Sequence, residues 1–584
     1  MSTTIRLAPA QVVVERRDDG TSILRSPEPL APFARVVGEW LVQWAAREPD
    51  RCFLAERRGE QWRRVTYAGA LDATRRIGTS LLERGLTAAT PVAILSDNSI
   101  DHALLTLGAM HAGIVVAPIS PAYSLVSRDH AKLKAIFELL RPGVVFAEDP
   151  GRFAPALAAV GATSTSIEAL LETDPSERID RAFAAIGPET IAKILFTSGS
   201  TGTPKGVINT QQMLCSNQQG WAQIWPFLED TPPVLCEWLP WNHTFGGNAT
   251  FNMVLRNGGT LYIDGGKPMP DLIALTARNL REVSPTLYFN VPRGFDLLLP
   301  LLESDDLLRQ SFFAKLDAMF YAGAALPQNL YNRLRALAAS QSHRRVFMLS
   351  GWGSTETAPG AAVVNFPIDG PEVVGNPLPG VELKLVPSGT KLEVRVRGPN
   401  VTPGYFGNPD LTRAAFDDDG FYKIGDAMRF VDADHPARGL AFDGRVIENF
   451  KLQSGTWVHA GAVRVRLIAA CNPLVQDAVI TGHDRNEIGA LVWVNPMAVR
   501  ALALDEDGVR TRLREALAIL HAESTGGSSA PCRLLVLEHP PSIDEGEITD
   551  KGYINQRAVL ERRAAHVDAL HAGGANVISV ASMT

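Results

Sequence analysis

The segment that most constrains this chain of 584 residues is a glycine- and hydroxyl-rich loop that follows an apolar strand. Residues 194–206 read ILFTSGSTGTPKG. Glycines let backbone N–H groups wrap an anion, hydroxyls add donors, and a lysine adds a mobile positive charge. A Gly/Ser run alone is more often a surface turn, but this order of residues predicts a polyphosphate site. The residues expected to bind there are Thr197, Ser198, Gly199, Ser200, Thr201, Gly202 and Lys205.

This loop differs from the more familiar nucleotide loop. That loop needs Gly-Lys followed by Ser or Thr at the start of a helix. Here Pro204 and Gly206 flank Lys205. We therefore expect that the segment does not run directly into a helix and that it stays mobile.

The composition excludes several classes of protein. A chain of this length is too long for one core, so two or more domains are expected. The net charge of −7 argues against a nucleic-acid surface, and no apolar run approaches the ~20 residues of a membrane span. Five widely spaced cysteines imply neither disulfides nor zinc, and no signal peptide is recognisable, so a cytoplasmic protein is expected.

Helical patterns alternate with short apolar runs from about residue 60, beginning with a helix after Thr66. This alternation predicts an α/β fold with stacked, mostly parallel sheets covered by helices. Phosphate-binding loops then lie at the carboxyl ends of strands. The expected strands are Val92–Leu95, Ile114–Ile119, Gly143–Phe146, Val234–Leu239, Leu261–Ile263, Leu287–Val291, Met319–Ala322 and Val346–Leu349.

The pattern changes after residue 380. Val381–Val386 and Leu392–Val396 alternate apolar and polar residues, as half-buried antiparallel strands do, and predict a β-rich part of the same domain. Gly439–Arg445 has the character of a junction. We therefore expect a large domain over residues 1–443 and a small α+β domain over residues 444–584.

Five further motifs follow the loop along the chain. They are Leu239–Gly247 (LPWNHTFGG), Gly351–Thr357 (GWGSTET), Tyr422–Asp426 (YKIGD), Gly444–Lys451 (GRVIENFK) and Asp544–Asn555 (DEGEITDKGYIN). Together with the loop they resemble, in order, the motifs of the adenylate-forming enzymes, which include acyl-CoA synthetases, luciferases and peptide-synthetase adenylation domains. This resemblance implies that the large domain binds ATP and an organic acid and that the small C-terminal domain is mobile.

The resemblance gives the second glycine-rich motif a role at the nucleotide. Trp352, followed by Gly353, packs on the adenine, Thr355 contacts the phosphates, and Glu356 helps to hold Mg²⁺. The physical chemistry agrees, because an indole offers a large π face and a carboxylate beside phosphate oxygens shares a hard cation. Taken alone, a Glu after such a turn is more often a helix-cap neighbour.

Two residues further along are implied to hold the ribose. A carboxylate can accept hydrogen bonds from both ribose hydroxyls at once, and the resemblance places Asp426 there. Arg445 matches the junction arginine that also reaches the ribose. Taken alone, Asp426 is a turn aspartate after a glycine.

Four positions relate to the acid and to the motion of the small domain. The resemblance implies that His243 gates the acyl pocket, and that Lys551 is the cation that closes over the carboxylate and the α-phosphate. Lys451 then faces the site during thioester formation. Ile447 occupies the hinge place, where Asp or Lys is usual. Read in isolation, the histidine is structural and Lys551 is a solvated lysine.

Two stretches, Phe450–Trp457 and Gly546–Asn555, are most similar to the feruloyl-CoA synthetase branch, which implies a hydroxycinnamic acid such as ferulic acid and a place in phenylpropanoid catabolism. The expected enzyme is an ATP-dependent acid–CoA ligase that uses Mg²⁺. The alternatives are a fatty-acyl-CoA synthetase, a ligase that loads a carrier protein, and a nucleotide-binding regulatory protein without catalysis. Homodimers are common in such families, so that state is an open alternative. Residues that could shape the acyl pocket are Phe289, Tyr321, Ala322 and Gly323.

Overall fold

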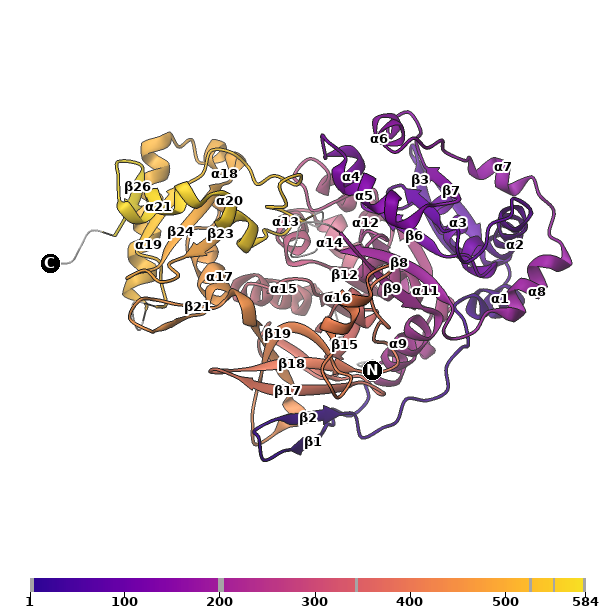
Figure 1. The fold of residues 1–584 in the computed structure, drawn as a ribbon, viewed down its shortest axis with the longest axis horizontal. Coiled ribbons are helices and arrows are strands. Elements are labelled where there is room, and N and C mark those ends of the chain that lie inside the picture. Colours follow the sequence, from indigo (N-terminus) through magenta and orange to yellow (C-terminus); the bar gives the residue numbers. More distant parts are fainter. Residues whose placement is uncertain (1–4, 198–203, 342–344, 525–527, 550–551, 581–584) are drawn as a thin grey trace. The chain divides into compact units, whose positions relative to one another are not determined.

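The computed structural model describes residues 5–197, 204–341, 345–524, 528–549 and 552–580 (Figure 1). The chain forms two compact units. The larger comprises residues 1–386, 394–424 and 430–441, and the smaller comprises residues 387–393, 425–429 and 442–584. The smaller unit therefore includes two short segments, residues 387–393 and 425–429, in addition to its continuous C-terminal part.

The first sheet of the larger unit contains the two strands that flank residues 198–204, the predicted phosphate-binding loop, which is called the phosphate loop below. Its strand order is β7-β5-β6-β8-β9, where β5, β6, β7 and β8 are parallel and β9 is antiparallel to β8. Its strands are β5 Val92–Leu95, β6 Val116–Ile119, β7 Val144–Ala147, β8 Ile191–Thr197 and β9 Lys205–Thr210. The strand β5 is buried at every position, as expected of a parallel strand covered on both faces.

The second sheet has the order β10-β11-β3-β4. The strands β10, β11 and β3 are parallel, and β4 returns antiparallel to β3. Their bounds are β3 Cys52–Arg58, β4 Gln61–Thr66, β10 Val234–Glu237 and β11 Thr260–Ile263. These two mostly parallel sheets confirm the fold class that the alternating pattern predicts.

The third sheet has eleven strands in the order β1-β2-β17-β18-β19-β20-β16-β15-β14-β13-β12. The run from β12 to β14 is parallel, whereas β15 and β16 are antiparallel. The strands β1 and β2, indigo in Figure 1, form a hairpin whose second strand pairs antiparallel with β17. The bounds are β1 Val13–Arg16, β2 Ser22–Arg25, β12 Leu287–Asn290, β13 Ala318–Tyr321, β14 Phe347–Gly353, β15 Gly360–Val363, β16 Val373–Pro377, β17 Glu382–Ser388, β18 Lys391–Arg397, β19 Tyr422–Phe430 and β20 Leu440–Arg445.

Helices surround these sheets, and their starts follow capping residues in the sequence. The hydroxyl of Thr66 accepts a hydrogen bond from Gly69 N at the start of α2, and Ser99 caps α3 in the same way. The helix expected after Thr66 is therefore confirmed as α2, which packs against α3. The helices are α1 Gly38–Arg47, α2 Tyr67–Glu83, α3 Ile100–His111, α4 Pro121–Leu125, α5 Ala131–Leu140, α6 Ala154–Ala159, α7 Ile167–Leu171, α8 Glu177–Ala185, α9 Gln211–Ile224, α10 Phe227–Asp230, α11 Phe251–Arg256, α12 Ile273–Glu282, α13 Pro292–Ser304, α14 Asp306–Phe313, α15 Gln328–Gln341 and α16 Pro409–Ala415.

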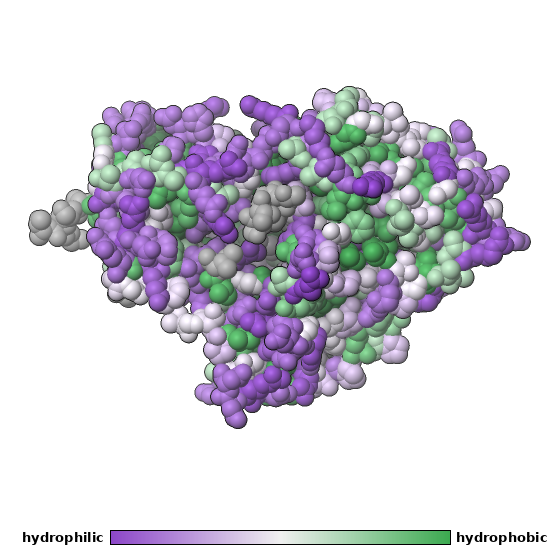
Figure 2. Space-filling model, in the orientation of Figure 1, coloured by the Kyte–Doolittle hydropathy of each residue, from purple (hydrophilic) through white to green (hydrophobic). Residues whose placement is uncertain are grey.

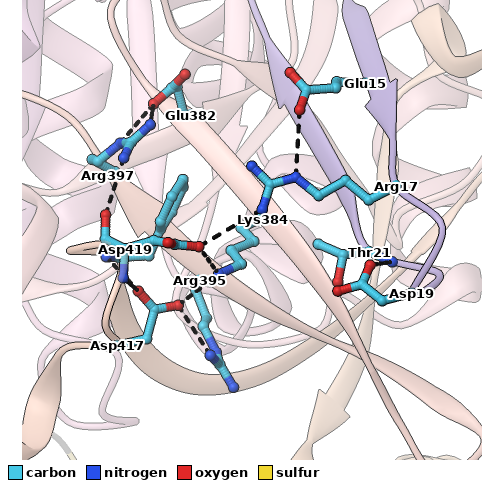
Figure 3. Close-up of polar contacts among 11 residues, drawn as sticks. Glu15, Arg17, Asp19, Thr21, Glu382, Lys384, Arg395, Arg397, Asp417 and Asp419 are labelled. Atoms are coloured by element: carbon cyan, nitrogen blue, oxygen red, sulfur yellow. Dashed lines mark hydrogen bonds and ion pairs between the residues drawn. The ribbon is translucent and has the colours of Figure 1, made fainter.

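A charged cluster connects neighbouring strands in the β-rich part of the larger unit (Figure 3). Asp417 lies at its centre, in the turn before β19, and accepts hydrogen bonds from Lys384 Nζ and Arg395 Nη1, each at 3.0 Å. Lys384 Nζ also lies 2.7 Å from Asp419, and Arg17 reaches Asp419 at 3.7 Å. These contacts tie the N-terminal hairpin, β17 and β18 to the start of β19.

The smaller unit is built on a four-stranded sheet of order β23-β24-β25-β26. Alternate residues of β23 and β24 belong to different cores: Ala478 and Val492 pack with α17 and α19, whereas Val479 and Leu491 pack with α20 and α21. Both faces of the sheet are thus covered. The elements are β21 Phe450–Lys451, β22 Trp457–Val458, α17 Ala460–Ala470, β23 Val475–Thr481, β24 Gly489–Val494, α18 Pro496–Ala501, α19 Glu506–Ala522, β25 Arg533–Val536, α20 Gln556–Arg562, α21 Ala564–Ala572 and β26 Val577–Ser579.

On the face drawn in Figure 2, hydrophilic and hydrophobic residues are interspersed. The most exposed large apolar side chains, Leu307, Val126 and Ile519, belong to different parts of the chain. Single exposed apolar residues are normal on protein surfaces. No helix in the part of the chain that the structure describes is long and apolar enough to cross a membrane.

Candidate active site

The phosphate loop connects two antiparallel strands. β8 ends at Thr197 and β9 begins at Lys205, and these two residues are paired in the register of the hairpin. Lys205 therefore starts a strand and not a helix, as the flanking Pro204 and Gly206 indicate. The predicted binding residues Ser198, Gly199, Ser200, Thr201 and Gly202, and the expected mobility of the loop, lie outside the described residues. Among those described, no hydrogen-bond partner is found for the buried Oγ1 of Thr197.

Lys205 and Glu356 lie together, although 150 residues separate them in the sequence. Lys205 Nζ is 3.5 Å from Glu356 Oε1. Between them lies Tyr405, whose hydroxyl accepts a hydrogen bond from Lys205 Nζ at 3.0 Å and donates one to Glu356 Oε1 at 3.0 Å. A second hydroxyl, that of Tyr422, lies 3.2 Å from the Tyr405 hydroxyl. The larger unit thus holds one cation and one carboxylate at a shared hydroxyl.

The electrostatics of this cluster favour an ionised carboxylate. Burial by itself raises the pKa of the Glu356 carboxyl, but the Lys205 ammonium and hydrogen bonds, including that from Tyr405, bring its pKa below the ordinary value. Burial also raises the pKa of the Tyr405 hydroxyl, which therefore remains a donor. An ionised, buried carboxylate beside a phosphate loop has the donor chemistry that Mg²⁺ prefers.

The turn that carries Glu356 is held in place by backbone contacts. Residues Thr355–Thr357 form a single 3₁₀ turn, and Thr402 N donates to the Glu356 carbonyl at 2.8 Å. Gly353 precedes it at a tight approach, since a Cβ there would lie 1.7 Å from the Pro359 carbonyl oxygen. Only glycine fits that position without a backbone shift.

Trp352 lies at the end of β14, next to an irregularity in the pairing with β15 between Trp352 and Gly353. Its side chain is mostly buried, with 9% of its surface exposed. Bulges of this kind redirect side chains at strand ends near binding sites. Trp352, Gly353, Thr355 and Glu356 therefore occupy one strand end and the turn after it.

Asp426 and Arg445, the two residues expected at the ribose, lie in the smaller unit and are close to one another. Arg445 Nε is 3.4 Å from Asp426 Oδ1. Asp426 is buried on β19, whereas the Arg445 side chain is 55% exposed at the end of β20. An exposed arginine beside a buried carboxylate is able to turn toward a ligand at little cost.

The segment expected at the acyl pocket ends in an unusual helical turn. His243 lies in the loop before it, where the His243 carbonyl accepts a hydrogen bond from Gly247 N at 2.8 Å. The next residues, Phe245–Thr250, form a π-helical turn that leads into α11. Glycines are needed here, because a Cβ on Gly246 would lie 2.3 Å from the Leu239 carbonyl oxygen. Single π-helical turns are frequent at functional sites.

Three further predicted residues, Lys451, Ile447 and Lys551, belong to the C-terminal part of the chain. Lys451 is exposed on β21, with its ammonium 5.0 Å from the centre of the Trp457 ring. The expected hinge position, Ile447, lies in a short 3₁₀ turn, Val446–Glu448. Lys551 lies outside the described residues.

Tyr405 is the site residue that the sequence patterns did not single out. It lies between β18 and α16, in a Gly-Tyr-Phe-Gly stretch without periodicity. Its place depends on a bridge between Tyr405 and Val207 on β9, which brings residues about 200 positions apart together. A glycine on each side of an aromatic pair was the only signal in the sequence.

Among the described residues there is no group of three or more His, Cys, Asp or Glu side chains that could hold a metal ion. Mg²⁺ does not need such a cage, because one or two carboxylates and substrate phosphates commonly bind it. Glu356 fits this requirement. The fold and the clustered side chains of Lys205, Tyr405 and Glu356 together define an α/β protein with a candidate phosphate site.

The chain belongs to the AMP-binding enzyme family, the adenylate-forming superfamily. The model of that family matches residues 41–406, and the model of the AMP-binding enzyme C-terminal domain matches residues 452–574. The superfamily inferred from the ordered motifs is therefore confirmed. The family comprises enzymes, which agrees with the predicted class of function.

Curated relatives are distant in sequence. The chain is 27% identical to the long-chain-fatty-acid–CoA ligase FadD15 of Mycobacterium bovis, over 87% of this chain and 92% of that protein. It is 24% identical to a 3-[(3aS,4S,7aS)-7a-methyl-1,5-dioxo-octahydro-1H-inden-4-yl]propanoyl:CoA ligase of Rhodococcus jostii, over 78% and 88%. The peptide synthetase CymA of Salinispora arenicola is 28% identical over 83% of this chain, which spans only 6% of that larger protein.

Solved structures share the fold. ATP-bound MatB from Rhodopseudomonas palustris matches with a TM-score of 0.69 and 24% identity, covering 91% of this chain and 99% of that one. The adenylation domain of a carboxylate reductase from Mycobacterium chelonae matches with a TM-score of 0.71 and 21% identity, covering 94% and 92%. These likenesses confirm the fold class of a large α/β domain followed by a small one.

Proposed function

We propose that this chain is an ATP-dependent acid–CoA ligase that forms an acyl-adenylate and then an acyl-CoA thioester. The observation that carries the proposal is the cluster of Lys205, Tyr405 and Glu356. It presents one ammonium and one ionised carboxylate at the strand that leaves the phosphate loop. Membership of the AMP-binding enzyme family supplies the reaction class.

In the first step, a carboxylate oxygen of the acid attacks the α-phosphorus of ATP, and the bond to the β-phosphate breaks, so pyrophosphate leaves. Thr197, Lys205 and the residues of the loop between them bind the phosphates as hydrogen-bond donors. Trp352, Asp426 and Arg445 hold the adenine and the ribose. Two anions are brought together in this step, so we propose that Lys551 balances their charge.

Glu356 is the side chain that holds Mg²⁺ in this proposal. The metal ion supplies charge neutralisation to the phosphates when bound. Thr355 lies beside Glu356 on the same turn and donates to a phosphate. The Lys205 ammonium pairs with Glu356 in the structure. In this proposal it turns from that carboxylate to the phosphates when the nucleotide binds.

In the second step, the sulfur of the CoA thiol attacks the acyl carbon and its proton passes to solvent, while AMP leaves with the electron pair of the broken bond. Adenylation is required because a free carboxylate is a poor electrophile. We propose that the small domain, residues 444–584, changes its position between the steps, with Ile447 at the hinge. Lys451 then faces the acyl group in place of Lys551.

The proposed acid is a hydroxycinnamic acid such as ferulic acid. Support comes from an aromatic cluster behind the acyl segment, in which the ring of Phe245 lies 6.2 Å from that of Phe289 and 5.9 Å from that of Phe320. His243, just before Phe245, gates the entry. Aromatic rings favour edge-to-face contact with an aryl substrate. A long aliphatic acid is the second candidate, favoured by the similarity to FadD15.

The test is a pyrophosphate-release assay with a panel of aryl and fatty acids, with and without CoA. Ferulic acid is expected to give the highest turnover and to yield its CoA thioester. Higher turnover with hexadecanoic acid would assign the fatty-acid alternative. Pyrophosphate release without formation of a CoA thioester would favour a carrier protein as the acceptor. Nucleotide binding without pyrophosphate release for any acid would refute the enzyme.

A further inference from the structure

The π-helical turn at the acyl segment has carbonyl groups that are satisfied from outside the turn. Lys193 Nζ donates a hydrogen bond to the carbonyl of Gly247 at 2.8 Å and lies 3.4 Å from Oδ1 of Asn248. Lys193 is only 3% exposed, and burial lowers its pKa to about 7. A buried amine is costly in a protein core unless it is hydrogen-bonded, and these two contacts supply its partners.

A second side chain holds the following two carbonyls. Gln218 Nε2 donates to the carbonyls of Asn248 and Ala249, each at 3.0 Å. Gln218 is 1% exposed, so water does not compete for these bonds. The side chain of Asn248 in turn donates to Asn209 Oδ1 at 2.8 Å. The turn is thus fixed by three buried side chains that belong to other elements.

These three side chains all belong to the elements around the phosphate loop. Lys193 is on β8, four residues before Thr197 at the start of the loop. Asn209 is on β9, which begins at Lys205, and Gln218 is on α9, which follows β9 directly. These hydrogen bonds therefore connect the hairpin directly to the carbonyls of the acyl segment, so a displacement of the hairpin would be transmitted to them.

We propose that Lys193 and Gln218 are positioning residues that couple the nucleotide site to the acid site. They hold the π-helical turn in the arrangement that presents His243 and Phe245 to the acid, and they make this arrangement depend on the state of the phosphate-loop hairpin. The inference rests on the proposed function, because it needs an acid and a nucleotide bound at once. It names residues for which the ordered motifs give no role.

The test measures the coupling directly. The affinity of the protein for ferulate, or for the acid with the highest turnover in the panel, is determined by calorimetry without nucleotide and with saturating α,β-methylene-ATP and Mg²⁺. In the wild-type protein the analogue is expected to tighten acid binding by about fivefold or more. In Lys193→Met the ratio of the acid affinities with and without the analogue is expected to fall below about twofold. Turnover at saturating acid is expected to fall less than kcat/KM for the acid.

Methionine has nearly the length and volume of lysine, so it is expected to fit the space beside Thr106, Trp241 and Gly247 that Lys193 occupies. Gln218→Met, on α9, is expected to lower the affinity ratio in the same way and serves as the test if Lys193→Met does not fold. The matched control is Thr276→Val, which removes a buried hydroxyl bonded to Asp264, and it is expected to keep the wild-type ratio.

The outcomes separate the two proposals. A lower melting temperature with an unchanged affinity ratio in both methionine variants would mean a structural role only and would overturn the inference. A wild-type ratio near one would overturn it as well. If the wild-type protein released no pyrophosphate with any acid, the proposed function would fail and the coupling would fall with it.

Discussion

Replacing Asp417 by asparagine tests how strongly the charged cluster of Figure 3 fixes the start of β19. The Asp417 carboxylate is 10% exposed and accepts hydrogen bonds from Lys384, Arg395 and, at 2.9 Å, the backbone N–H of Phe421. Burial opposes ionisation, but the hydrogen bond from Phe421 and the two cations outweigh it and lower the pKa of Asp417 to about 2.

The magnitude follows from linkage. A pKa of about 2 in the folded protein, against about 3.9 in an unfolded chain, corresponds to roughly 2 to 3 kcal/mol of stability at pH 7. The folded pKa is depressed, so this contribution is complete above the unfolded pKa and is lost as the pH falls toward 2. The destabilisation by Asp417→Asn is therefore expected to be about 2 to 3 kcal/mol at pH 7 and roughly half of that at pH 3.

The assay is urea unfolding at pH 7 and at pH 3, followed by tryptophan fluorescence and restricted to the first transition, because a protein of two units need not unfold in one step. The control is Asp174→Asn, which removes an ion-pairing carboxylate that is 89% exposed. It is expected to leave the midpoint unchanged. If Asp417→Asn lowered the free energy of unfolding equally at both pH values, or did not lower it at pH 7, the electrostatic reasoning would be refuted.

Three further predictions concern the catalytic steps. Lys551→Ala is expected to abolish pyrophosphate release but still to convert supplied acyl-adenylate and CoA to thioester; equal loss of both half-reactions would remove its assignment. Asp426→Ala is expected to raise KM for ATP strongly and KM for the acid little, and the reverse pattern would place Asp426 elsewhere. Gly353→Ala is expected to weaken ATP binding at least tenfold in calorimetry, because its Cβ must displace the Pro359 carbonyl next to the turn of Glu356; wild-type affinity would contradict this.

Much of the fold could be predicted from local patterns. The strand expected at Val92–Leu95 has those bounds in β5, and the alternation after residue 380 correctly predicted β17 and β18. Continuous apolar runs indicate buried parallel strands, because such strands are covered on both faces. Those features depend on neighbours in the chain, so the sequence pattern contains them.

The rest depends on contacts between distant segments. The side chain of Tyr405 lies beside Glu356, and Tyr405 bridges to β9, but no periodicity in the sequence around Tyr405 indicates either contact. The π-helical turn is likewise held by Lys193, about 55 residues earlier, and no helical periodicity reveals it. The roles of the predicted site residues stay predictions, and those of the loop residues Ser198–Gly202 and of Lys551 lie outside the described part of the chain.

The pairing of β2 with β17 has a consequence for the synthesis of the chain. Leu24 is opposite Leu383, so 359 residues must be translated after β2 before its partner exists. At 5–20 residues per second that interval is about 20 to 70 s. During this time the apolar residues Ile23 and Leu24 lack their final cover, and an unpaired strand edge is open to wrong partners. The nascent polypeptide is therefore expected to depend on chaperones until about two thirds of it has left the ribosome.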